Sequence, residues 1–251
     1  MMTFTEECLL NHKSVRRFKD QPVEKELLNR IVACAQHAAT SEFIQAYTII
    51  NITDRDVVQA IYDQVTAQKT FLHAPVFMIF CADVNRLVRA CQMNDRTCPQ
   101  DYMAYTETFL MASCDTAIAA QNAVAAAEAN GLGCTYIGGI RNNLPKVIEL
   151  LSLPEGVYPL FGMAMGYPLE NTDEAAKPRL PLEVVFKENT YDTAGDEAAI
   201  RQYDQVIRNY YVERTGGERD ETWTQQMSDF VQKPQRPQLK EVLQSQGFML
   251  K

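Results

Sequence analysis

Two short basic segments contain side chains that could bind a phosphate or the polar edge of a heterocycle. In the first, residues 12–18, an extended chain would point His12, Ser14 and Arg16 to one side. That side presents an imidazole, a hydroxyl and a guanidinium, which suit phosphate oxygens or ring carbonyls. A solvated basic segment that follows a helix C-terminus would contain the same residue types. Taken alone, the segment leaves both interpretations open.

The second basic segment is Lys177-Pro178-Arg179, which places two cations two residues apart. Because proline favours an extended neighbour, both cations can reach the same side. Elsewhere Gln68 offers an amide, and the Gly138-Gly139 pair would let a planar ligand lie against bare backbone. Each of these features also occurs in ordinary surface loops and turns, so none identifies a site by itself.

The sequence lacks the motifs that several common kinds of catalytic and binding site require. The three histidines form neither an HExxH motif nor a cluster with cysteines, so we expect no metal site. There is no GxSxG motif and no GxxxxGK[ST] phosphate loop. The Gly131-Leu132-Gly133 stretch begins like a dinucleotide fingerprint but lacks the third glycine and follows a predicted helix. A Rossmann dinucleotide fold is therefore not expected.

The composition excludes other classes of protein. The chain has 251 residues, of which 46% are hydrophobic, and its net charge of −8 argues against binding nucleic acid or anionic membranes. Seven cysteines without a CxxC pair are typical of reduced thiols in the cytoplasm. The N-terminus does not resemble a signal peptide, and no apolar segment reaches the length of a membrane span. We therefore expect a cytoplasmic protein.

The elements that must position these side chains follow from hydrophobic spacing. Helices are predicted over residues 3–10, 24–38, 54–67, 100–130, 142–151, 197–212 and 222–231, and strands over 47–52, 76–82 and 158–166. The alanine-rich segment 100–130 would form a central helix about 46 Å long. The order of elements predicts one α+β domain, with a core over residues 1–168. We expect residues 169–251 to form a C-terminal extension that lacks a core of its own.

The basic segments and glycines together resemble one known family. In order along the chain, His12-x-Ser14-x-Arg16-x-Phe18, Gln68-Lys69, Tyr136–Asn143 and Lys177–Pro181 resemble motifs of the FMN-dependent nitroreductase superfamily, and within it the oxygen-insensitive NADPH nitroreductase and NADPH–flavin oxidoreductase branch. The resemblance covers nearly the whole chain. It implies a nitroreductase-like fold with a central, mostly antiparallel sheet flanked by helices. It also implies an intertwined homodimer, with the long helix at the dimer axis and residues 169–251 over the partner.

The resemblance also implies the residues of the site. FMN, bound tightly but not covalently, would be held by His12, Lys13, Ser14, Arg16, Thr40, Ser41, Gln68, Ile137, Gly138, Gly139, Lys177 and Arg179. Lys13 replaces an arginine that is usual in the family. Thr40 and Ser41 match a loop that reaches FMN from the partner subunit, in which Glu42 replaces a common serine. Arg214 matches the arginine that binds the extra phosphate of NADPH, and Arg219 lies close by.

The activity implied is a two-electron, ping-pong reduction of nitroaromatics, quinones or free flavin, with NADPH as the reductant and NADH possible. The chemistry takes place at the N5 atom of FMN, so no side chain is expected to act as an obligatory acid or base. Two alternatives stay open. One is an FMN reductase that uses NADH and supplies reduced flavin to a partner, and the other is a flavin-binding redox sensor without turnover.

Overall fold

The computed structural model describes residues 2–99, 101–169 and 176–251. The chain divides into two compact units, one comprising residues 1–172 with 236–251 and the other residues 173–235. The end of the chain packs with the first unit, where the Leu250 and Lys251 N–H groups donate to the Ala104 carbonyl at 2.9 and 3.1 Å. The sequence analysis did not anticipate this return of the C-terminus.

A four-stranded antiparallel sheet forms the centre of the first unit, with strand order β1-β2-β4-β3. The strands are β1 (Tyr47–Asn51), β2 (Val76–Asp83), β3 (Gly133–Ile137) and β4 (Val157–Gly166). All 8 residues of β2 are buried, because side chains alternate between two faces that are both covered. The predicted α+β class and antiparallel sheet are confirmed, and β1, β2 and β4 lie where the sequence predicts strands.

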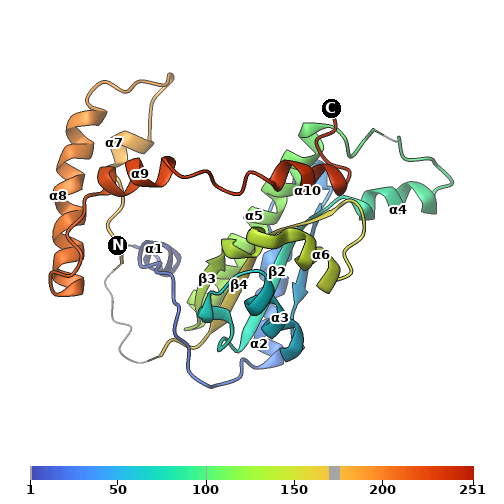
Figure 1. Ribbon diagram of the computed structural model, residues 1–251, viewed down its shortest axis with the longest axis horizontal. Coiled ribbons are helices and arrows are strands. Elements are labelled where there is room, and N and C mark those ends of the chain that lie inside the picture. The colour runs from blue at the N-terminus through green and yellow to red at the C-terminus, as the bar shows by residue number, and fades with distance from the viewer. Residues whose placement is uncertain (1, 100, 170–175) are drawn as a thin grey trace. The chain divides into compact units, whose positions relative to one another are not determined.

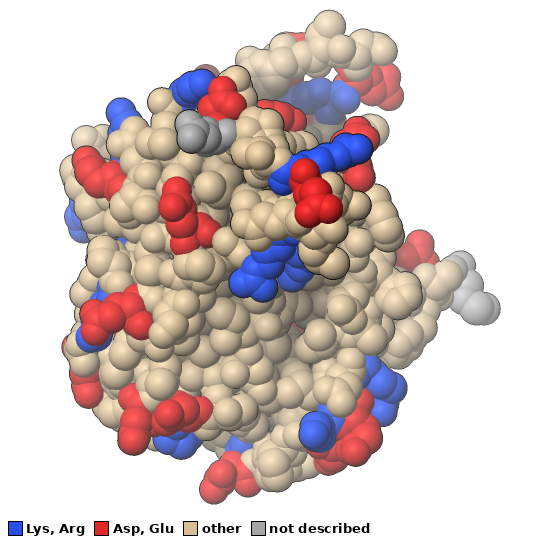
Figure 2. All heavy atoms as spheres, turned by 90° about the vertical axis from the view of Figure 1, so that its right-hand side faces the viewer, with Lys and Arg blue, Asp and Glu red and all other residues tan. Residues whose placement is uncertain are grey.

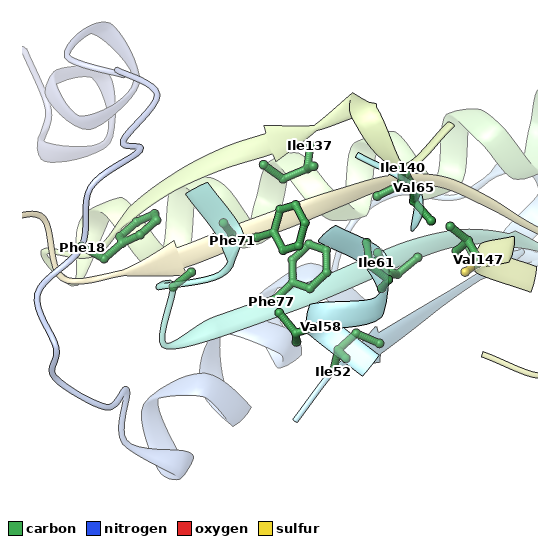
Figure 3. Packing of buried hydrophobic residues seen from close by; sticks show 14 of the residues in the cluster. Phe18, Ile52, Val58, Ile61, Val65, Phe71, Phe77, Ile137, Ile140 and Val147 are labelled. Atoms are coloured by element: carbon green, nitrogen blue, oxygen red, sulfur yellow. The ribbon is translucent and has the colours of Figure 1, made fainter. Parts of the chain in front are cut away.

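Helices pack on both faces of this sheet (Figure 1). Those of the first unit are α1 (Phe4–Leu10), α2 (Lys25–Gln36), α3 (Arg55–Gln64), α4 (Asn85–Met93), α5 (Thr106–Ala129), α6 (Leu144–Leu150) and α10 (Leu239–Ser245). On one face α2 and α5 contact alternate residues of β2, namely Val76, Met78 and Phe80. On the other face α3 and α6 share a cluster with Phe77 and Ile79. In Figure 3 the Phe77 ring lies beside Phe71, with 4.6 Å between ring centroids.

The long helix is shorter than the sequence predicts. It begins at Thr106 and not at residue 100, so its 24 residues span about 36 Å. Before it the chain forms turns, in which the Tyr102 N–H donates to Pro99 O and the Ala104 N–H to Asp101 O, both at 3.0 Å. These turns give the Tyr102 and Ala104 N–H groups hydrogen-bond partners without a helix. The helices α4 and α10 were not predicted.

The second unit contains α7 (Leu182–Val185), α8 (Asp196–Thr215) and α9 (Trp223–Val231). Thr222 caps α9 with a capping box, as its position before the apolar residues requires. The buried residues Tyr203, Ile207 and Tyr211 of α8 form a small cluster with partly buried Trp223. The expectation that this segment lacks a core is therefore wrong, since one face of α8 supplies a small aromatic one.

Charged side chains are intermixed on the face drawn in Figure 2. Blue Lys and Arg side chains stand singly or in small groups, with red Asp and Glu side chains among them. Within the described ranges, each helix is too short or too polar to cross a membrane. On this face, therefore, the figure shows no broad basic surface.

Candidate functional site

The basic segment 12–18 lies along the β3 edge of the sheet. Ser14 forms a parallel bridge with Cys134, and the Val15 N–H donates to the Cys134 carbonyl at 2.9 Å. Val15 is buried, whereas Ser14 and Arg16 are exposed. The backbone pairing therefore fixes the segment and leaves a hydroxyl and a guanidinium at the surface.

Gly133 makes this close pairing possible. A Cβ at Gly133 would lie 2.4 Å from Cγ2 of Val15, closer than carbon atoms can approach. At its other end the segment bridges to the residues after β4, where Phe18 pairs with Pro168 and is buried. Both ends are thus anchored to the sheet.

His12 is engaged with the central helix. Its Nδ1 lies 2.7 Å from Oε1 of Glu128 on α5, and both side chains are largely shielded from solvent. Burial raises the pKa of Glu128, and the hydrogen bond and charge of His12 oppose that rise. The imidazole that the sequence places beside Ser14 and Arg16 therefore has a carboxylate partner within the chain.

The Gly138-Gly139 pair forms the turn that follows β3, within the short 3-10 helix η3 (Gly138–Asn143). On either side of the pair, Ile137 and Ile140 belong to the buried cluster drawn in Figure 3. The two isoleucines anchor the turn to the core. The backbone of the two glycines is consequently held in one place.

Gln68 lies beside this bare backbone. It precedes the short 3-10 helix η2 (Lys69–Phe71), whose Phe71 is buried in the same cluster. A Cβ at Gly139 would lie 2.4 Å from Oγ1 of Thr66 and 3.1 Å from Oε1 of Gln68, so only glycine fits there. The structure thus brings Gln68, predicted from the sequence, to the glycine pair.

Arg141 is a neighbour of the glycine pair to which the sequence analysis assigned no role. Its Nη2 would lie 3.3 Å from a Cβ at Gly138, and its Nη1 donates to the Leu160 carbonyl of β4. Burial and the nearby charge of Arg236 lower the pKa of Arg141. The guanidinium therefore ties the glycine turn to the sheet.

Thr40 and Ser41 lie in a loop held by the carboxylate of Asp115, a fully buried residue of α5. The Ser41 N–H donates to Asp115 Oδ1 at 2.8 Å, and the Ala46 N–H donates to Oδ2 at 3.1 Å. The Thr40 hydroxyl oxygen is buried and has no hydrogen-bond partner among the residues that the structure describes. A lone carboxylate among the alanines of this helix was the signal that could have identified Asp115.

The same loop has an unusual backbone. Three residues between its anchors have positive φ angles, Glu42 at 47°, Phe43 at 58° and Gln45 at 50°. Each such residue costs about 1–2 kcal/mol, so the conformation persists only where the surroundings offset that cost. The two hydrogen bonds to Asp115 fix the chain on either side of these residues, and the Phe43 side chain is 80% exposed.

The loop 40–46 and the basic segment 12–18 belong to opposite edges of the sheet. The loop leads into β1, and the segment pairs with β3, which are the first and last strands in the sheet order. At about 4.8 Å between neighbouring strands, the two edges are about 14 Å apart. The structure thus ties the Thr40–Ser41 loop to α5 and β1, and Ser14 to β3.

In the second unit, Lys177 and Arg179 line a pocket of about 320 Å³ together with Tyr203, Tyr211 and Trp223. The Tyr203 hydroxyl donates to the Pro178 carbonyl at 2.9 Å, which fixes the Lys177-Pro178-Arg179 segment to α8. The Lys177 ammonium lies 5.4 Å from the centroid of the Tyr211 ring. Burial raises the pKa of Tyr203, and the charge of Arg179 opposes this. Both cations of the segment thus lie at one pocket.

Arg214 and Arg219 differ in their surroundings. Arg219 packs its guanidinium 3.8 Å from the Tyr211 ring centroid and donates to Gln226 Oε1 at 2.7 Å and Glu221 Oε2 at 3.1 Å. Arg214 is exposed in the last turn of α8, with its Nη1 3.1 Å from the Tyr210 hydroxyl. Arg219 therefore has a structural role in this unit, and Arg214 is the more accessible cation.

Comparison with known proteins gives one family for the whole chain. The model of the nitroreductase family matches residues 9–167, and that of the nitroreductase family C-terminal domain matches residues 177–251. The chain is 40% identical to an oxygen-insensitive NADPH nitroreductase of Salmonella typhimurium, over 98% of this chain and 99% of that protein. It is 39% identical to an FMN reductase (NADPH) of Bacillus subtilis, over 98% and 99% of the two chains.

A solved nitroreductase structure from Bacillus subtilis has the same fold. It superimposes with a TM-score of 0.93 at 38% identity, over 98% of this chain and all of that one. The sheet, the glycine turn and the two basic segments thus lie in a chain that matches known nitroreductases from near one end to the other. The chain belongs to the nitroreductase family.

Proposed function

We propose that this chain is an NADPH-dependent flavin oxidoreductase that binds FMN and reduces nitroaromatics, quinones or free flavin. Relatives named oxygen-insensitive NADPH nitroreductase and FMN reductase (NADPH) support this activity. Bound FMN supplies hydride transfer and two-electron reduction, which the side chains of the protein cannot perform. The protein's own task is to bind the flavin, orient it and leave one face open.

The observation that carries the proposal is the bare glycine backbone beside an amide. The Gly138-Gly139 turn is fixed to the core, and Gln68 lies next to it. A flat ring can approach a backbone without side chains, and an amide can pair with the donors and acceptors at the ring edge. Ser14 and Arg16 are exposed on the segment that pairs with β3, the strand that leads into this turn.

We infer that the FMN phosphate is bound by cations from both basic segments. Arg16 offers a guanidinium fork that matches phosphate oxygens. Lys177 and Arg179, at the pocket of the second unit, add two further charges. Lys13 supplies a charge without the fork of an arginine. Each group acts by binding and orientation only.

We assign the extra phosphate of NADPH to Arg214, with Arg219 as its neighbour. Arg214 lies at the end of α8, next to Gly216 and Gly217, which both have positive φ angles. Glycines of this kind allow the mobility that a co-substrate needs when it enters and leaves. The contacts of Arg219 with Tyr211 and Gln226 support a secondary role for it.

We propose further that the active form is a cytoplasmic homodimer. Thr40 and Ser41 lie at the β1 edge, away from the β3 edge where Ser14 and Arg16 are exposed. A second copy of the chain could supply this loop to the flavin. Each flavin site would thus need two chains. The seven cysteines, free in the structure, support a reducing compartment.

The decisive experiment is the visible spectrum of the purified protein before and after NADPH is added under argon. We expect the absorption of bound flavin, rapid bleaching by NADPH, and recovery when a quinone is added. A protein that binds no FMN when reconstituted would refute the site. Bleaching without turnover on nitroaromatics, quinones or flavin would favour a redox sensor, and equal kcat/KM for NADH and NADPH would favour the NADH-using reductase.

A further inference from the structure

A shielded histidine–carboxylate pair joins the first basic segment to the central helix, and the proposed function gives its carboxylate no task. Nδ1 of His12 lies 2.7 Å from Oε1 of Glu128, and the two side chains are 27% and 14% exposed. Glu128 belongs to the last turn of α5 and is 116 positions from His12 along the chain. The contact therefore fixes, through tertiary structure, one end of a segment whose Ser14 and Arg16 are exposed.

The position of Glu128 is unfavourable for a carboxylate. The C-terminal end of a helix has a partial negative charge, which repels anions in the last turn. The last turn of α5 contains no basic residue, and burial raises the pKa of Glu128. The hydrogen bond and the charge of His12 oppose that rise. A carboxylate in this place thus depends on the imidazole for its charge.

The imidazole, in contrast, lies where a positive charge is favoured. His12 directly follows α1, where its N–H donates to the Leu9 carbonyl at 3.4 Å, and its ring faces the end of α5. Both places are helix C-termini, which favour cations. A separation of 2.7 Å is also typical of a charge-assisted hydrogen bond. The geometry therefore fits an imidazolium that donates from Nδ1 to the carboxylate.

Other titratable groups surround Glu128, which lines a cavity of about 320 Å³. They come from three elements: Glu7 and Cys8 of α1, Lys13 of the basic segment, and Cys134 and Tyr136 of β3. Burial, and after it the charge of Glu128, raises the pKa of both thiols. Burial raises the pKa of Tyr136 to about 12. The thiols and the phenol therefore stay neutral at pH 7, and Lys13 and exposed Glu7 are the other charged residues of the cavity lining.

We propose that Glu128 is a positioning residue for flavin binding, which acts through His12. Because Nδ1 is engaged, a ligand of the basic segment can meet the ring only at Nε2. In the imidazolium Nε2 has a proton, which it can donate to an oxygen atom of FMN. Glu128 fixes the plane of the ring and keeps it protonated, much as carboxylates orient the histidines of metal sites. This inference rests on the proposed function, because it assigns a task within the FMN site.

The test measures FMN binding by equilibrium dialysis of the full-length, FMN-loaded protein over a range of pH values. In Glu128→Gln the amide oxygen can still accept from Nδ1 but no longer favours the charged ring. FMN binding should therefore weaken about 5- to 10-fold at neutral pH. Binding should also fall at a lower pH than in the unchanged protein, because deprotonation of the ring removes the Nε2 donor. Titration of the FMN phosphate itself is common to both proteins.

A double-mutant cycle shows whether Glu128 acts through His12. In His12→Gln there is no ring to protonate, so adding Glu128→Gln should change FMN binding by less than about 2-fold. The control Glu149→Gln alters a carboxylate of α6 that accepts from Lys146 at 2.8 Å, and it should retain FMN fully. Unchanged affinity and pH profile in Glu128→Gln would overturn the inference. An equal loss in the His12→Gln background would also overturn it, since that is the result of a merely structural role.

NMR spectra of protein with isotope-labelled histidine separate the inference from the proposed function. The chain has only three histidines, and the signals of His12 are those missing from His12→Gln. In Glu128→Gln the His12 ring should lose its charge at a lower pH than in the unchanged protein. A protein that binds no FMN refutes the proposed function. FMN binding together with identical His12 titrations in the two proteins refutes the inference alone.

Discussion

Arg16 and Arg179 are the residues on which flavin retention should depend most. Each is an exposed guanidinium at a place fixed by the backbone, Arg16 beside β3 and Arg179 at the pocket of α8. A charge-assisted hydrogen bond contributes about 1.5–3 kcal/mol, so loss of either should weaken FMN binding about 10- to 150-fold. Equilibrium dialysis or flavin fluorescence of Arg16→Ala and Arg179→Ala measures this effect.

The matched controls are arginines of similar exposure elsewhere. Arg30 is exposed on α2, and Arg201 pairs with Glu197 on the surface of α8 at 2.6 Å. Arg30→Ala and Arg201→Ala should retain FMN as the unchanged protein does. If Arg16→Ala and Arg179→Ala also retained full flavin absorbance on dilution, neither arginine would bind the phosphate.

The variants Arg214→Ala and Arg219→Ala should differ in kcat/KM when NADPH and NADH are compared as co-substrates. Arg214→Ala should lower kcat/KM for NADPH about 10-fold or more and leave kcat/KM for NADH nearly unchanged, since only NADPH has the extra phosphate. Arg219→Ala should also lower the stability of the second unit, because this side chain stacks on Tyr211 and bonds Gln226. Equal losses for both co-substrates in Arg214→Ala would contradict the assignment.

At the level of elements, Asp115 should control the loop before β1. In Asp115→Asn one carboxylate oxygen becomes an NH₂ group that faces a backbone N–H, so one anchor of the loop is lost. The unpaired buried donors should cost about 1–3 kcal/mol of unfolding free energy, measured by chemical denaturation. Amide hydrogen exchange should accelerate at residues 41–46, the segment that Asp115 holds.

The control for the loop is Asp63→Asn, an exposed carboxylate on α3 that accepts a hydrogen bond from its helix neighbour Gln59 at 3.0 Å. It should change neither stability nor exchange at residues 41–46. Unchanged exchange in Asp115→Asn would show that other contacts hold the positive φ angles of this loop.

The Gly138-Gly139 turn gives a second prediction at the level of elements. Gly139→Ala places a methyl group 2.4 Å from Oγ1 of Thr66, whereas the methyl group of Gly138→Ala meets Nη2 of Arg141 at 3.3 Å, a contact that a small shift relieves. The first should cost about 1–3 kcal/mol of stability through overpacking and the second much less. Thermal denaturation of the two variants tests this ranking, and a reversed order would mean that the turn is not fixed by the core.

The sequence predicted correctly those elements whose residue pattern lies within a few neighbouring positions. Helix α9 and the β-branched strands β1 and β2 lie where the sequence predicts them, because helical spacing and strand composition act over a few residues. The start of α5 was misplaced, because turns at Tyr102 and Ala104 satisfy the backbone without a change in composition. Strand β3 was not predicted as a strand, since it is short and its pairing with β4 and with the segment 12–18 involves residues distant in the sequence.

The site was predictable only in part, for a related reason. Ser14, Gln68 and the glycine pair carry residue types that can bind a flavin. Two residues that fix neighbouring backbone act through long-range contacts, Asp115 on the loop 40–46 and Arg141 at the glycine turn. Asp115 bonds a segment 74 positions away along the chain, and no spacing rule links such residues. Sequence reasoning therefore predicts candidate binding groups and misses the residues that fix the backbone around them.

On the scale of the whole molecule, the central helix has two different sides. One side of α5 is buried and made of small residues, among them Ala112, Ala119 and Ala123. The other carries Leu110 and Ile118, which are 51% and 45% exposed, with exposed Cys114 between them at the same four-residue spacing. An exposed apolar row on a central helix is typical of a subunit interface.

This row should therefore control dimerisation. Leu110→Asp combined with Ile118→Asp places two charges in the interface, so the protein should sediment as a monomer at micromolar concentration. The monomer should also lose FMN, since the Thr40–Ser41 loop of a second chain would no longer reach the flavin. The control Met93→Asp changes an equally apolar side chain, 85% exposed at the end of α4, and should remain a flavin-loaded dimer. A wild-type protein that sediments as a monomer with FMN bound would show that one chain completes the site by itself.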